Sequence, residues 1–402
     1  MNKLSIDKVD LKNKRVLVRV DFNVPLDEKL NVTNDIRIIE SLPTIKKIIG
    51  SGGKAILMSH LGRPKGEPKP EFSLKPAAER LGKLLGKEVK LAPDCIGAET
   101  EKLVSDMKPG EVALLENLRF HKQEEKNDPE FAKQLANLGE VYINDAFGSA
   151  HRAHASTEGV TKYIKTCAAG YLMQKELDYL GNALANPKRP YCAVLGGAKI
   201  SGKIDVINNL LDKVDILIVG GGMAFTFFKA QGKEIGKSLL EEEKLELAKE
   251  LLKKIKSSKL IFLLPVDVVA ADEFKNDSPA ITVEVDKIPA DKMGLDIGPK
   301  SIKLFSDELM KSKTIVWNGP MGVFEMNNFA KGTFAVAETL AKVTESGTIT
   351  VIGGGDSAAA IAEAGLEKKV SHVSTGGGAS LEFLEGKVLP GVSALTDTQN
   401  YL

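Results

Sequence analysis

The sequence contains little cysteine and almost no net charge, and each shortage excludes a class of protein. Its three cysteines, Cys95, Cys167 and Cys192, are far apart and lack the spacing of metal ligands. We therefore expect reduced thiols in a cytosolic protein rather than a disulfide framework. Lysine plus arginine number 55 and aspartate plus glutamate 54, which gives a formal net charge of +1. Nucleic-acid and membrane-surface proteins usually carry a strong basic imbalance, so any anion site must be a local cluster.

Long apolar segments are also missing. The most apolar stretch, Lys259 to Ala271, is too short to span a bilayer and contains Pro265 and Asp267. The segment from Met1 to Asp7 has no apolar core of the kind found in signal peptides. We therefore expect a cytoplasmic protein without a membrane role, and its 402 residues predict two domains.

Short runs of valine, isoleucine and leucine alternate with helical patterns along the whole chain. Continuous apolar runs are typical of parallel strands that are covered on both faces, and the intervening segments are long enough for crossover helices. The predicted fold class is α/β, with two Rossmann-like, doubly wound parallel-sheet domains joined by a helical hinge. The predicted strands are Arg15–Val20, Ala55–Ser59, Val112–Leu115, Val141–Asn144, Tyr191–Leu195, Ile216–Val219, Leu260–Leu264, Thr314–Trp317, Thr348–Ile352 and His372–Ser374.

Two segments predict helices of particular interest. Residues 171–186 carry Met173, Leu177, Leu180 and Leu184 at helical spacing before a proline, and we interpret them as the connection between the domains. Residues 238–258 form an amphipathic pattern whose charges are best explained as a solvated face.

Glycine-rich turns follow apolar runs in the second half, as at Gly196–Gly197, Gly220–Gly222 and Gly353–Gly355. Such turns would place several helix N-termini along one sheet edge, where α/β sheets bind ligands. The segment from Gly197 onward nearly matches a P-loop, but Ile204 replaces the serine or threonine that would hold magnesium, so we do not expect a true P-loop.

Charged residues beside these turns have both a functional and a structural interpretation. Lys199 and Lys203 are four residues apart, which on a helix puts them on one face, either holding an anion between them or merely solvated. Asp356 is either a helix N-cap or a magnesium ligand. Glu325 either accepts hydrogen bonds from a ribose or is an ordinary loop glutamate.

Arginine and histidine gather in loops of the first 152 residues. The guanidinium group binds carboxylate and phosphate in a bidentate manner, and several of these residues lie near predicted strand ends, which favours one basic pocket. Its candidate members are Arg37, Arg63, Arg119 and Arg152, with His60, His151 and His154. No catalytic triad and no metal-ligand spacing of cysteine or histidine is found in the sequence.

Eight motifs, in order across nearly the whole chain, resemble those of the phosphoglycerate kinase family. They are RVDFNVP at Arg19–Pro25, HLGRP at His60–Pro64, ENLRF at Glu116–Phe120, NDAFG at Asn144–Gly148, HRAH at His151–His154, GGAK at Gly196–Lys199, WNGPMG at Trp317–Gly322 and GGGDS at Gly353–Ser357.

The resemblance implies a role for each motif. It divides the chain into a phosphoglycerate-binding domain (residues 1–170), a hinge (171–186), a nucleotide-binding domain (187–386) and a C-terminal segment (387–402) that packs on the first domain. The implied substrate-binding residues are Asp21, Phe22, Asn23, Arg37, His60, Leu61, Gly62, Arg63, Arg119 and Arg152. The implied nucleotide-binding residues are Gly197, Lys203, Gly220, Gly294, Asn318, Glu325, Gly354, Gly355, Asp356 and Ser357, with Asp356 on Mg²⁺. The implied catalytic residues are Arg37, Lys199, Gly354 and Gly377.

The implied reaction is the reversible transfer of a phosphoryl group from 1,3-bisphosphoglycerate to MgADP, which gives 3-phosphoglycerate and ATP, by a monomer that closes about its hinge. Both possible nucleophiles, a phosphate oxygen and a carboxylate, are ionised near pH 7, so no general base is expected.

Two other functions are compatible with parts of the pattern. The glycine turns suit an NAD-dependent dehydrogenase, but the ribose-binding acid expected about 20 residues after Gly353–Gly355 is replaced by His372–Ser374. A non-catalytic metabolite-binding protein with hinged lobes is the second alternative.

Overall fold

The computed structural model describes residues 2–401, without the side chains of residues 182–184. It consists of two compact units, of which unit 1 contains Met1–Asp178 and Val388–Leu402, and unit 2 contains Tyr179–Lys387. The division falls within helix α6 (Tyr171–Ala185). Leu184, one of the residues used to predict this helix, lies outside the described side chains. No helix within residues 2–401 is both long and apolar enough to cross a membrane.

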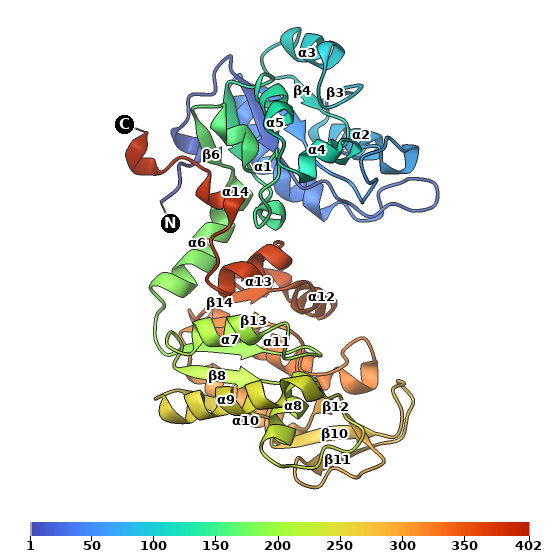
Figure 1. Ribbon diagram of the computed structural model, residues 1–402, viewed down its shortest axis with the longest axis vertical. Helices are drawn as coiled ribbons and strands as arrows, with labels where there is room; N and C mark the ends of the chain where they lie inside the picture. Colours follow the sequence, from blue (N-terminus) through green and yellow to red (C-terminus); the bar gives the residue numbers. More distant parts are fainter. Residues whose placement is uncertain (1, 402) are drawn as a thin grey trace. The chain divides into compact units, whose positions relative to one another are not determined.

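Unit 1 is built on a parallel sheet with the strand order β3-β4-β2-β1-β5-β6 (Figure 1). Val16 and Val18 belong to the core that includes α1 and α2, and Leu17 between them is fully buried on the other face. Burial on both faces explains the continuous apolar runs. The strands are β1 (Arg15–Arg19), β2 (Lys54–Met58), β3 (Val89–Leu91), β4 (Val112–Leu114), β5 (Val141–Asn144) and β6 (Cys167–Ala169). The helices include α1 (Ile36–Gly50), α2 (Lys75–Leu85), α3 (Ala98–Ser105), α4 (Lys122–Glu125) and α5 (Pro129–Ala136).

The C-terminal segment belongs to unit 1 and is fastened there by backbone hydrogen bonds. Thr396 N donates to Cys167 O of β6 (2.9 Å), and Leu4 N donates to Thr396 O (2.8 Å). Helix α14 (Pro390–Ser393) begins beside Ala150, whose carbonyl accepts from Gly391 N at 2.8 Å. The two ends of the chain therefore extend the same side of the unit 1 sheet.

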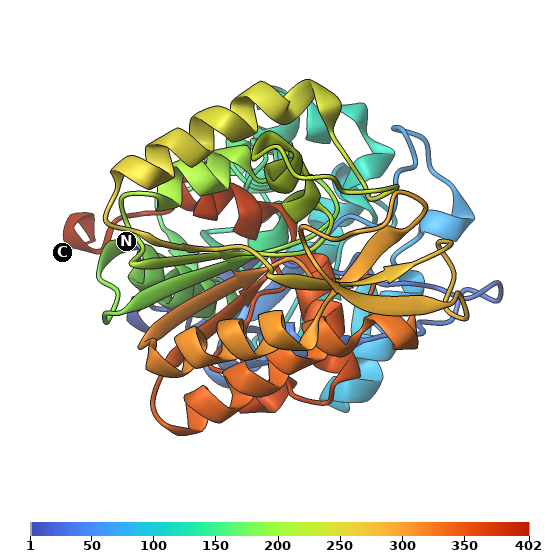
Figure 2. The ribbon, with the colours of Figure 1, turned by 90° about the horizontal axis from the view of Figure 1, so that it is seen from below.

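Unit 2 contains a second parallel sheet, with the order β15-β14-β13-β7-β8-β9. Figure 2 shows α9 on one face of this sheet and α10 and α11 on the other. The strands are β7 (Tyr191–Leu195), β8 (Ile216–Val219), β9 (Ile261–Leu263), β13 (Thr314–Asn318), β14 (Ile349–Gly353) and β15 (His372–Val373). The helices include α7 (Ile204–Leu210), α8 (Met223–Ala230), α9 (Leu245–Ser257), α10 (Pro299–Lys311), α11 (Lys331–Glu345), α12 (Gly355–Glu363) and α13 (Gly378–Leu384).

Unit 2 also carries a small antiparallel sheet that the sequence analysis does not predict. Its order is β11-β10-β12, with β10 (Asp267–Ala271), β11 (Ala280–Glu284) and β12 (Met293–Ile297). Strand β10 lies in the same apolar stretch as β9, and only Leu264, Pro265 and Val266 separate the two. Strand β11 is largely exposed and therefore has no continuous apolar run.

The predicted fold class is confirmed, and all ten predicted strands are present with ends shifted by at most two residues. The short strands β3 and β6 are missing from the prediction. The predicted helix 238–258 begins only at Leu245, after a short 3-10 turn. Its first part is irregular because Ser238 Oγ accepts from Gly294 N (2.9 Å) and the Glu241 carboxylate accepts from Ser201 N (3.0 Å), which ties these residues to neighbouring loops.

Asp145, at the carboxyl end of β5, caps the first turn of α6. Its Oδ1 accepts from Leu172 N (2.9 Å) and Met173 N (3.3 Å). The carboxyl is fully buried, and this burial raises its pKa to about 7 despite the hydrogen bonds that it accepts. Gly170 is packed so closely that a Cβ there would lie 2.2 Å from Asp145 Oδ1.

The raised pKa of Asp145 predicts a pH-dependent stability. Between about pH 4 and pH 7 the folded protein holds a proton that the unfolded chain has released, so the free energy of unfolding falls as the pH rises, by at most about 1.4 kcal/mol per pH unit. Asp145→Asn keeps the Oδ1 acceptor but cannot titrate. Calorimetry from pH 4.5 to 8 is expected to show a smaller decline in thermal midpoint for Asp145→Asn than for wild type, whereas the exposed-site control Asp106→Asn follows wild type. Equal declines in Asp145→Asn and wild type would contradict the assignment.

Candidate active site

The basic residues of unit 1 lie in loops that follow the carboxyl ends of neighbouring strands. Asp21 and Asn23 follow β1, and His60 follows β2. Arg119 lies in η3 (Leu118–Phe120) after β4, and Arg152 lies beyond β5 and η4 (Phe147–Ser149). Because all these strands are parallel, the loops share one edge of the sheet, where α/β proteins bind ligands.

Two imidazoles show that the guanidinium groups converge. Burial lowers the pKa of His60 well below its usual value, and the charges of Arg19, Arg119 and Arg37 lower it further. The pKa of His154 falls to about 4 through burial and the charges of Arg19, Arg119 and Arg152. Arginines therefore lie near both rings, and both rings remain neutral at physiological pH because a further positive charge there would be repelled.

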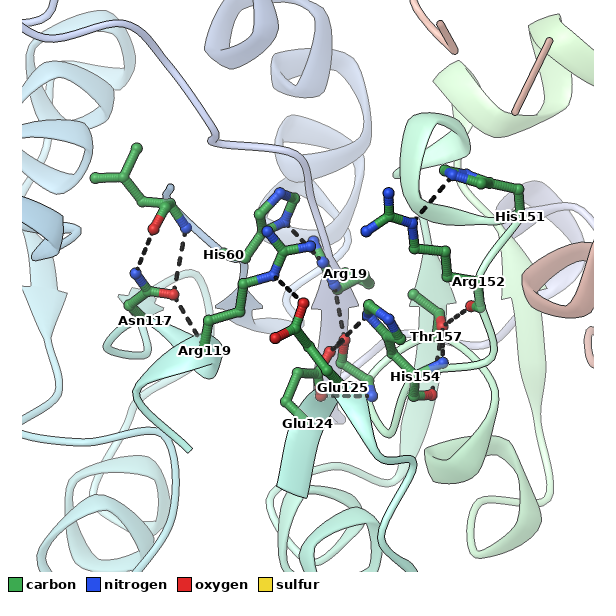
Figure 3. Close-up of polar contacts among 12 residues, drawn as sticks. Arg19, His60, Asn117, Arg119, Glu124, Glu125, His151, Arg152, His154 and Thr157 are labelled. Atoms are coloured by element: carbon green, nitrogen blue, oxygen red, sulfur yellow. Dashed lines mark hydrogen bonds and ion pairs between the residues drawn. The ribbon is translucent and has the colours of Figure 1, made fainter. Parts of the chain in front are cut away.

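Arg119 thus lies near both rings, Arg37 near His60 and Arg152 near His154, and Figure 3 shows four of these five side chains. Arg63 is exposed on the same loop as His60, and no contact within residues 2–401 holds its guanidinium beside the others. The backbone carbonyls of Leu61 and Gly62 fix two side chains that come from the loop after β4. The Gly62 carbonyl accepts from Arg119 Nη1 at 2.9 Å, and the Leu61 carbonyl accepts from Asn117 Nδ2 at 2.7 Å.

Asp21, Phe22 and Asn23 organise the loop after β1. Asp21 Oδ2 pairs with Arg37 Nη1 at 2.7 Å. Asn23 Oδ1 accepts from Gly62 N at 2.9 Å and so joins the β1 and β2 loops. Phe22 is fully buried; its backbone N–H donates to Ser59 Oγ, and its carbonyl accepts from Val24 N. Asp21, Asn23 and Arg37 therefore supply the polar side chains of this region.

Beneath this surface lies a buried polar chain that the sequence analysis does not identify. Arg19 is 1% exposed, and its Nε donates to Ser156 Oγ at 2.8 Å. Ser156 in turn donates from its N–H to Glu124 at 3.0 Å, and from its hydroxyl to the same carboxylate. Burial raises the pKa of Glu124, whereas Arg19 and the Ser156 hydrogen bonds oppose that rise. In the sequence, the feature that indicates this buried polar chain is a single arginine, Arg19, at the end of an apolar strand.

Arg19 also decides which nitrogen of His60 carries the proton. Its Nη2 lies 3.0 Å from His60 Nδ1 (Figure 3). A guanidinium can only donate, so Nδ1 must accept and the proton of the neutral ring resides on Nε2. His60 therefore carries an uncharged N–H donor at Nε2.

The second candidate region is a pocket of about 390 Å³ in unit 2. It is formed by turns at the carboxyl ends of β7, β8 and β13 together with strands β10 and β12 of the small sheet. Apolar side chains form most of the wall, and the carboxylates of Glu325 and Asp356 provide the acidic groups together with Asp296. Its lining includes Gly197, Gly221, Gly222, Phe225, Phe228, Met293, Gly294 and Met321.

Close backbone approach requires glycine at several of these turns. A Cβ on Gly319 (φ +105) would lie 2.2 Å from Gly196 O, and a Cβ on Gly221 (φ +68) would lie 2.7 Å from Gly197 N. At Gly294 a Cβ would lie 2.1 Å from the Phe225 ring. The three turns therefore pack against each other through their backbones, and the pocket floor contains few side chains.

Polar donors gather where α12 begins beside β13. Gly354 (φ +87) precedes the helix, and Ser357 Oγ accepts from Gly319 N at 2.6 Å. The Lys203 ammonium contacts Asn318 Oδ1. The Asn318 Nδ2 group is buried without a hydrogen-bond partner in the described part of the chain. Burial lowers the pKa of Lys203 to about 8, and the Asp356 charge opposes this shift.

The expectation that Lys199 and Lys203 lie on one helical face is wrong. Residues 196–203 form a turn that precedes α7, so their separation by four residues carries no helical geometry. Lys203 is half-buried beside Asn318, whereas Lys199 is exposed near Glu241, whose pKa it helps to lower. The two ammonium groups therefore occupy different environments.

The proposed nucleotide residues fall into two groups. Gly197, Gly294, Glu325 and Asp356 line the pocket. The others support its wall or lie at helix starts; Gly220, for example, packs under Met321, where a Cβ would lie 2.5 Å from Sδ. Gly377 (φ +50), whose implied role is catalytic rather than nucleotide-binding, precedes α13. The remaining members of this second group are Lys203, Asn318, Gly354, Gly355 and Ser357.

Comparisons with known proteins agree over the whole chain. The phosphoglycerate kinase family model matches residues 6–387. The phosphoglycerate kinase of Chloroherpeton thalassium is 64% identical over 397 residues, which cover 99% of this chain and 100% of the relative. That of Chlorobium phaeobacteroides is 60% identical over the same shares.

Solved structures give the same result. Phosphoglycerate kinase from Coxiella burnetii is similar with a TM-score of 0.91 and 44% identity, over 98% of each chain. The enzyme from Pyrococcus horikoshii OT3 gives a TM-score of 0.82 and 31% identity, also over 98% of each chain. These comparisons support neither the dehydrogenase nor the metabolite-binding alternative. The chain belongs to the phosphoglycerate kinase family and is a phosphotransferase.

Proposed function

We propose that unit 1 binds 3-phosphoglycerate or 1,3-bisphosphoglycerate, that unit 2 binds MgADP or MgATP, and that the acyl phosphoryl group passes reversibly and directly between them. The observation that carries the proposal is the set of arginines around two neutral imidazoles in unit 1. A ring of permanent positive charge, with His60 as an uncharged donor, suits a small ligand that carries both a phosphate and a carboxylate.

In unit 1 the guanidinium groups of Arg63, Arg119 and Arg152 bind the phosphate of the glycerate substrate, and Asp21 and Asn23 bind its hydroxyl and carboxyl end. Arg37 and His60 face the group to be transferred. The support for these roles is the common sheet edge and the mutual electrostatic influence of the guanidinium and imidazole groups. Arg63 is assigned from its place in the HLGRP motif, since it makes no contact that fixes its guanidinium.

In unit 2 the adenine occupies the apolar slot between Gly294 and the turn after β8, and Glu325 accepts hydrogen bonds from the ribose. The phosphate chain lies over the N-terminus of α12, where Gly354, Gly355 and Ser357 present backbone N–H groups. Lys203 and the unpaired Nδ2 of Asn318 supply further donors. A buried amide donor without a partner is what a phosphate oxygen would satisfy.

The residues beside the phosphate position fit a magnesium ion. Asp356 is exposed in the first turn of α12, lines the pocket and interacts electrostatically with Lys203. Magnesium is held in proteins by one or two carboxylates together with substrate phosphates, and Asp356 supplies that carboxylate. When bound, the ion neutralises charge on the phosphate oxygens.

The protein contributes charge neutralisation and positioning, because no proton has to be removed from either nucleophile. Lys199, Arg37 and the backbone N–H groups at Gly354 and Gly377 stabilise the charge on the phosphoryl oxygens during transfer. The imidazoles of His60 and His154 are neutral, and the tautomer of His60 is fixed, which suits a role in hydrogen bonding rather than proton transfer.

Closure of the hinge completes the proposal. The reacting atoms must come within about 3 to 3.5 Å, and water must be excluded from the phosphoryl group. Because the two ligands bind to different units, the units have to approach each other, with α6 and the segment around Val388, which is 77% exposed, as the connections.

Small-angle scattering tests the closure. With MgADP and 3-phosphoglycerate together, which cannot react with each other, the radius of gyration is expected to fall relative to the ligand-free enzyme, while either ligand alone has a smaller effect. The forward scattering is expected to give the mass of one chain, since all proposed site residues lie in a single chain. Unchanged dimensions with both ligands would refute the hinge.

A Lys199→Ala variant tests the chemical step. In an assay that measures ATP formed from ADP and 1,3-bisphosphoglycerate, we expect the wild type to be active and the variant to lose about 100- to 1,000-fold in kcat, as when one transition-state donor is removed. The Kd for ADP is expected to change little, because Lys199 is exposed and does not line the pocket. The matched Lys203→Ala variant is expected to weaken ADP binding instead, and the reverse pattern would exchange the two roles.

An Arg63→Ala variant tests the substrate site. Loss of a charged hydrogen bond costs about 1.5 to 3 kcal/mol, so the KM for 3-phosphoglycerate is expected to rise about 10- to 100-fold. The KM for ATP is expected to stay the same. Arg15→Ala is the control, because Arg15 begins β1 at the opposite edge of the same sheet and pairs with Glu140. An unaltered KM in Arg63→Ala would remove this residue from the pocket.

A further inference from the structure

Three side chains of different chemistry meet on unit 1 outside the substrate pocket. Asp94 and Cys95 lie in the loop between β3 and α3, and His121 lies between η3 and α4. Strands β3 and β4 are paired neighbours, with Leu91 opposite Leu114, so the loops that follow them start side by side. One carboxylate oxygen, one sulfur and one ring nitrogen of these residues all lie within 4.8 Å of one another.

The contacts within this group are already ordered. His121 Nε2 lies 2.7 Å from Asp94 Oδ1, and the same oxygen accepts from Cys95 N at 2.6 Å. The Cys95 side chain is fully buried, whereas the side chains of His121 and Asp94 are 24% and 42% exposed. The His121 ring packs near Phe131, with ring centroids 5.3 Å apart. The thiol of Cys95 is thus shielded from solvent, whereas His121 and Asp94 expose the other side of the group to solvent.

We propose that Asp94, Cys95 and His121 form a binding site for a borderline transition-metal ion, Zn²⁺ in particular, with its fourth position open to solvent. Thiolate, imidazole and carboxylate are the ligands that zinc takes in proteins, and three protein ligands with one open position is a recurrent arrangement. Magnesium prefers oxygen ligands alone, so the site is distinct in chemistry from the one proposed at Asp356.

The geometry requires only a local adjustment. Zinc bonds of about 2.0 to 2.3 Å at tetrahedral angles place ligand atoms about 3.3 to 3.5 Å apart. The Asp94 and His121 atoms have to separate slightly from 2.7 Å, and both have to approach the sulfur from a distance of at most 4.8 Å. These movements fall on the partly exposed loop side chains of Asp94 and His121, while the buried sulfur stays in place.

The proton balance of binding follows from the ligand types. The Cys95 S–H bond breaks, an S–Zn bond forms and one proton leaves to solvent. His121 binds as the neutral ring through Nε2, so its remaining proton moves to Nδ1. Because one proton is released for each ion bound, metal affinity increases with pH.

Cobalt(II) is the probe that tests the site, because thiolate coordination gives it an ultraviolet charge-transfer band that nitrogen and oxygen ligands do not. Added to the reduced, full-length protein in excess Mg²⁺, one equivalent of Co²⁺ is expected to produce the band, and Zn²⁺ is expected to abolish it. The band should disappear in Cys95→Ala and be lost or strongly weakened in His121→Gln. It should persist in Cys192→Ala, which removes another fully buried thiol, in β7.

Absence of the band in the wild-type protein overturns the proposal, as does a band that survives Cys95→Ala or is unaffected by His121→Gln. If Cys95→Ala fails to fold, the wild-type titration and the His121→Gln variant still test the proposal, because His121 is only half-buried and its replacement disturbs the fold less. Substrate-site histidines that bind cobalt do not interfere, because they supply no sulfur. Phosphotransferase activity of His121→Gln, assayed with Mg²⁺ and without Co²⁺ or Zn²⁺, is a check that the fold is intact.

Discussion

The buried chain from Glu124 through Ser156 and Arg19 to His60 is the interaction on which the anion site of unit 1 depends. Arg19, Arg37, Arg119 and Arg152 influence the same small region, and such crowding is unfavourable unless charge is compensated. Glu124 supplies a buried acceptor, and Ser156 links it to Arg19. Burial of charge is costly, so this arrangement is explained by organisation of the site rather than by stability. The histidines remain neutral in consequence, and the pocket's charge resides in guanidinium groups that do not titrate near pH 7.

In the proposed function, both units hold an anion at the carboxyl edge of a parallel sheet, but with different parts of the chain. Unit 1 presents long side chains, which suit a small ligand with compact charges. Unit 2 presents backbone N–H groups at turns. Gly196, Gly221 and Gly319 lie so close to neighbouring backbone that a Cβ on any of them would clash, so these positions require glycine. A polyphosphate chain extends along several turns, so donors spread over the backbone match its length, and few charged side chains are needed.

The sequence predicts the parallel sheets well because burial on both faces leaves continuous apolar runs, and Val141–Asn144 agrees at both ends with β5. The antiparallel sheet escapes prediction because Ala280–Glu284 is mostly exposed and has no such run. For the site, motifs identify the exposed arginines, but Arg19 and Glu124 are recognised only in three dimensions. Arg19 ends an apolar strand, and Glu124 lies in a charged stretch that resembles a solvated surface. Lys199 and Lys203 show the converse error, since a spacing of four has meaning only on a helix.

A search for metal-ligand spacing in the sequence detects only ligands that are close together along the chain. The cysteines lack such spacing, but the sheet can still bring one of them close to ligands from distant parts of the chain. Cys95 and His121 are far apart in sequence, yet the pairing of β3 with β4 places the loops that carry them at one edge. The same topology that gathers Arg119 and His60 therefore gathers Asp94, Cys95 and His121. His121 is two residues beyond Arg119, and its carbonyl accepts from the N–H of Glu124 at 3.2 Å. An ion held at Asp94, Cys95 and His121 would thus be fastened to the turn that connects a substrate arginine with the buried acid beneath it.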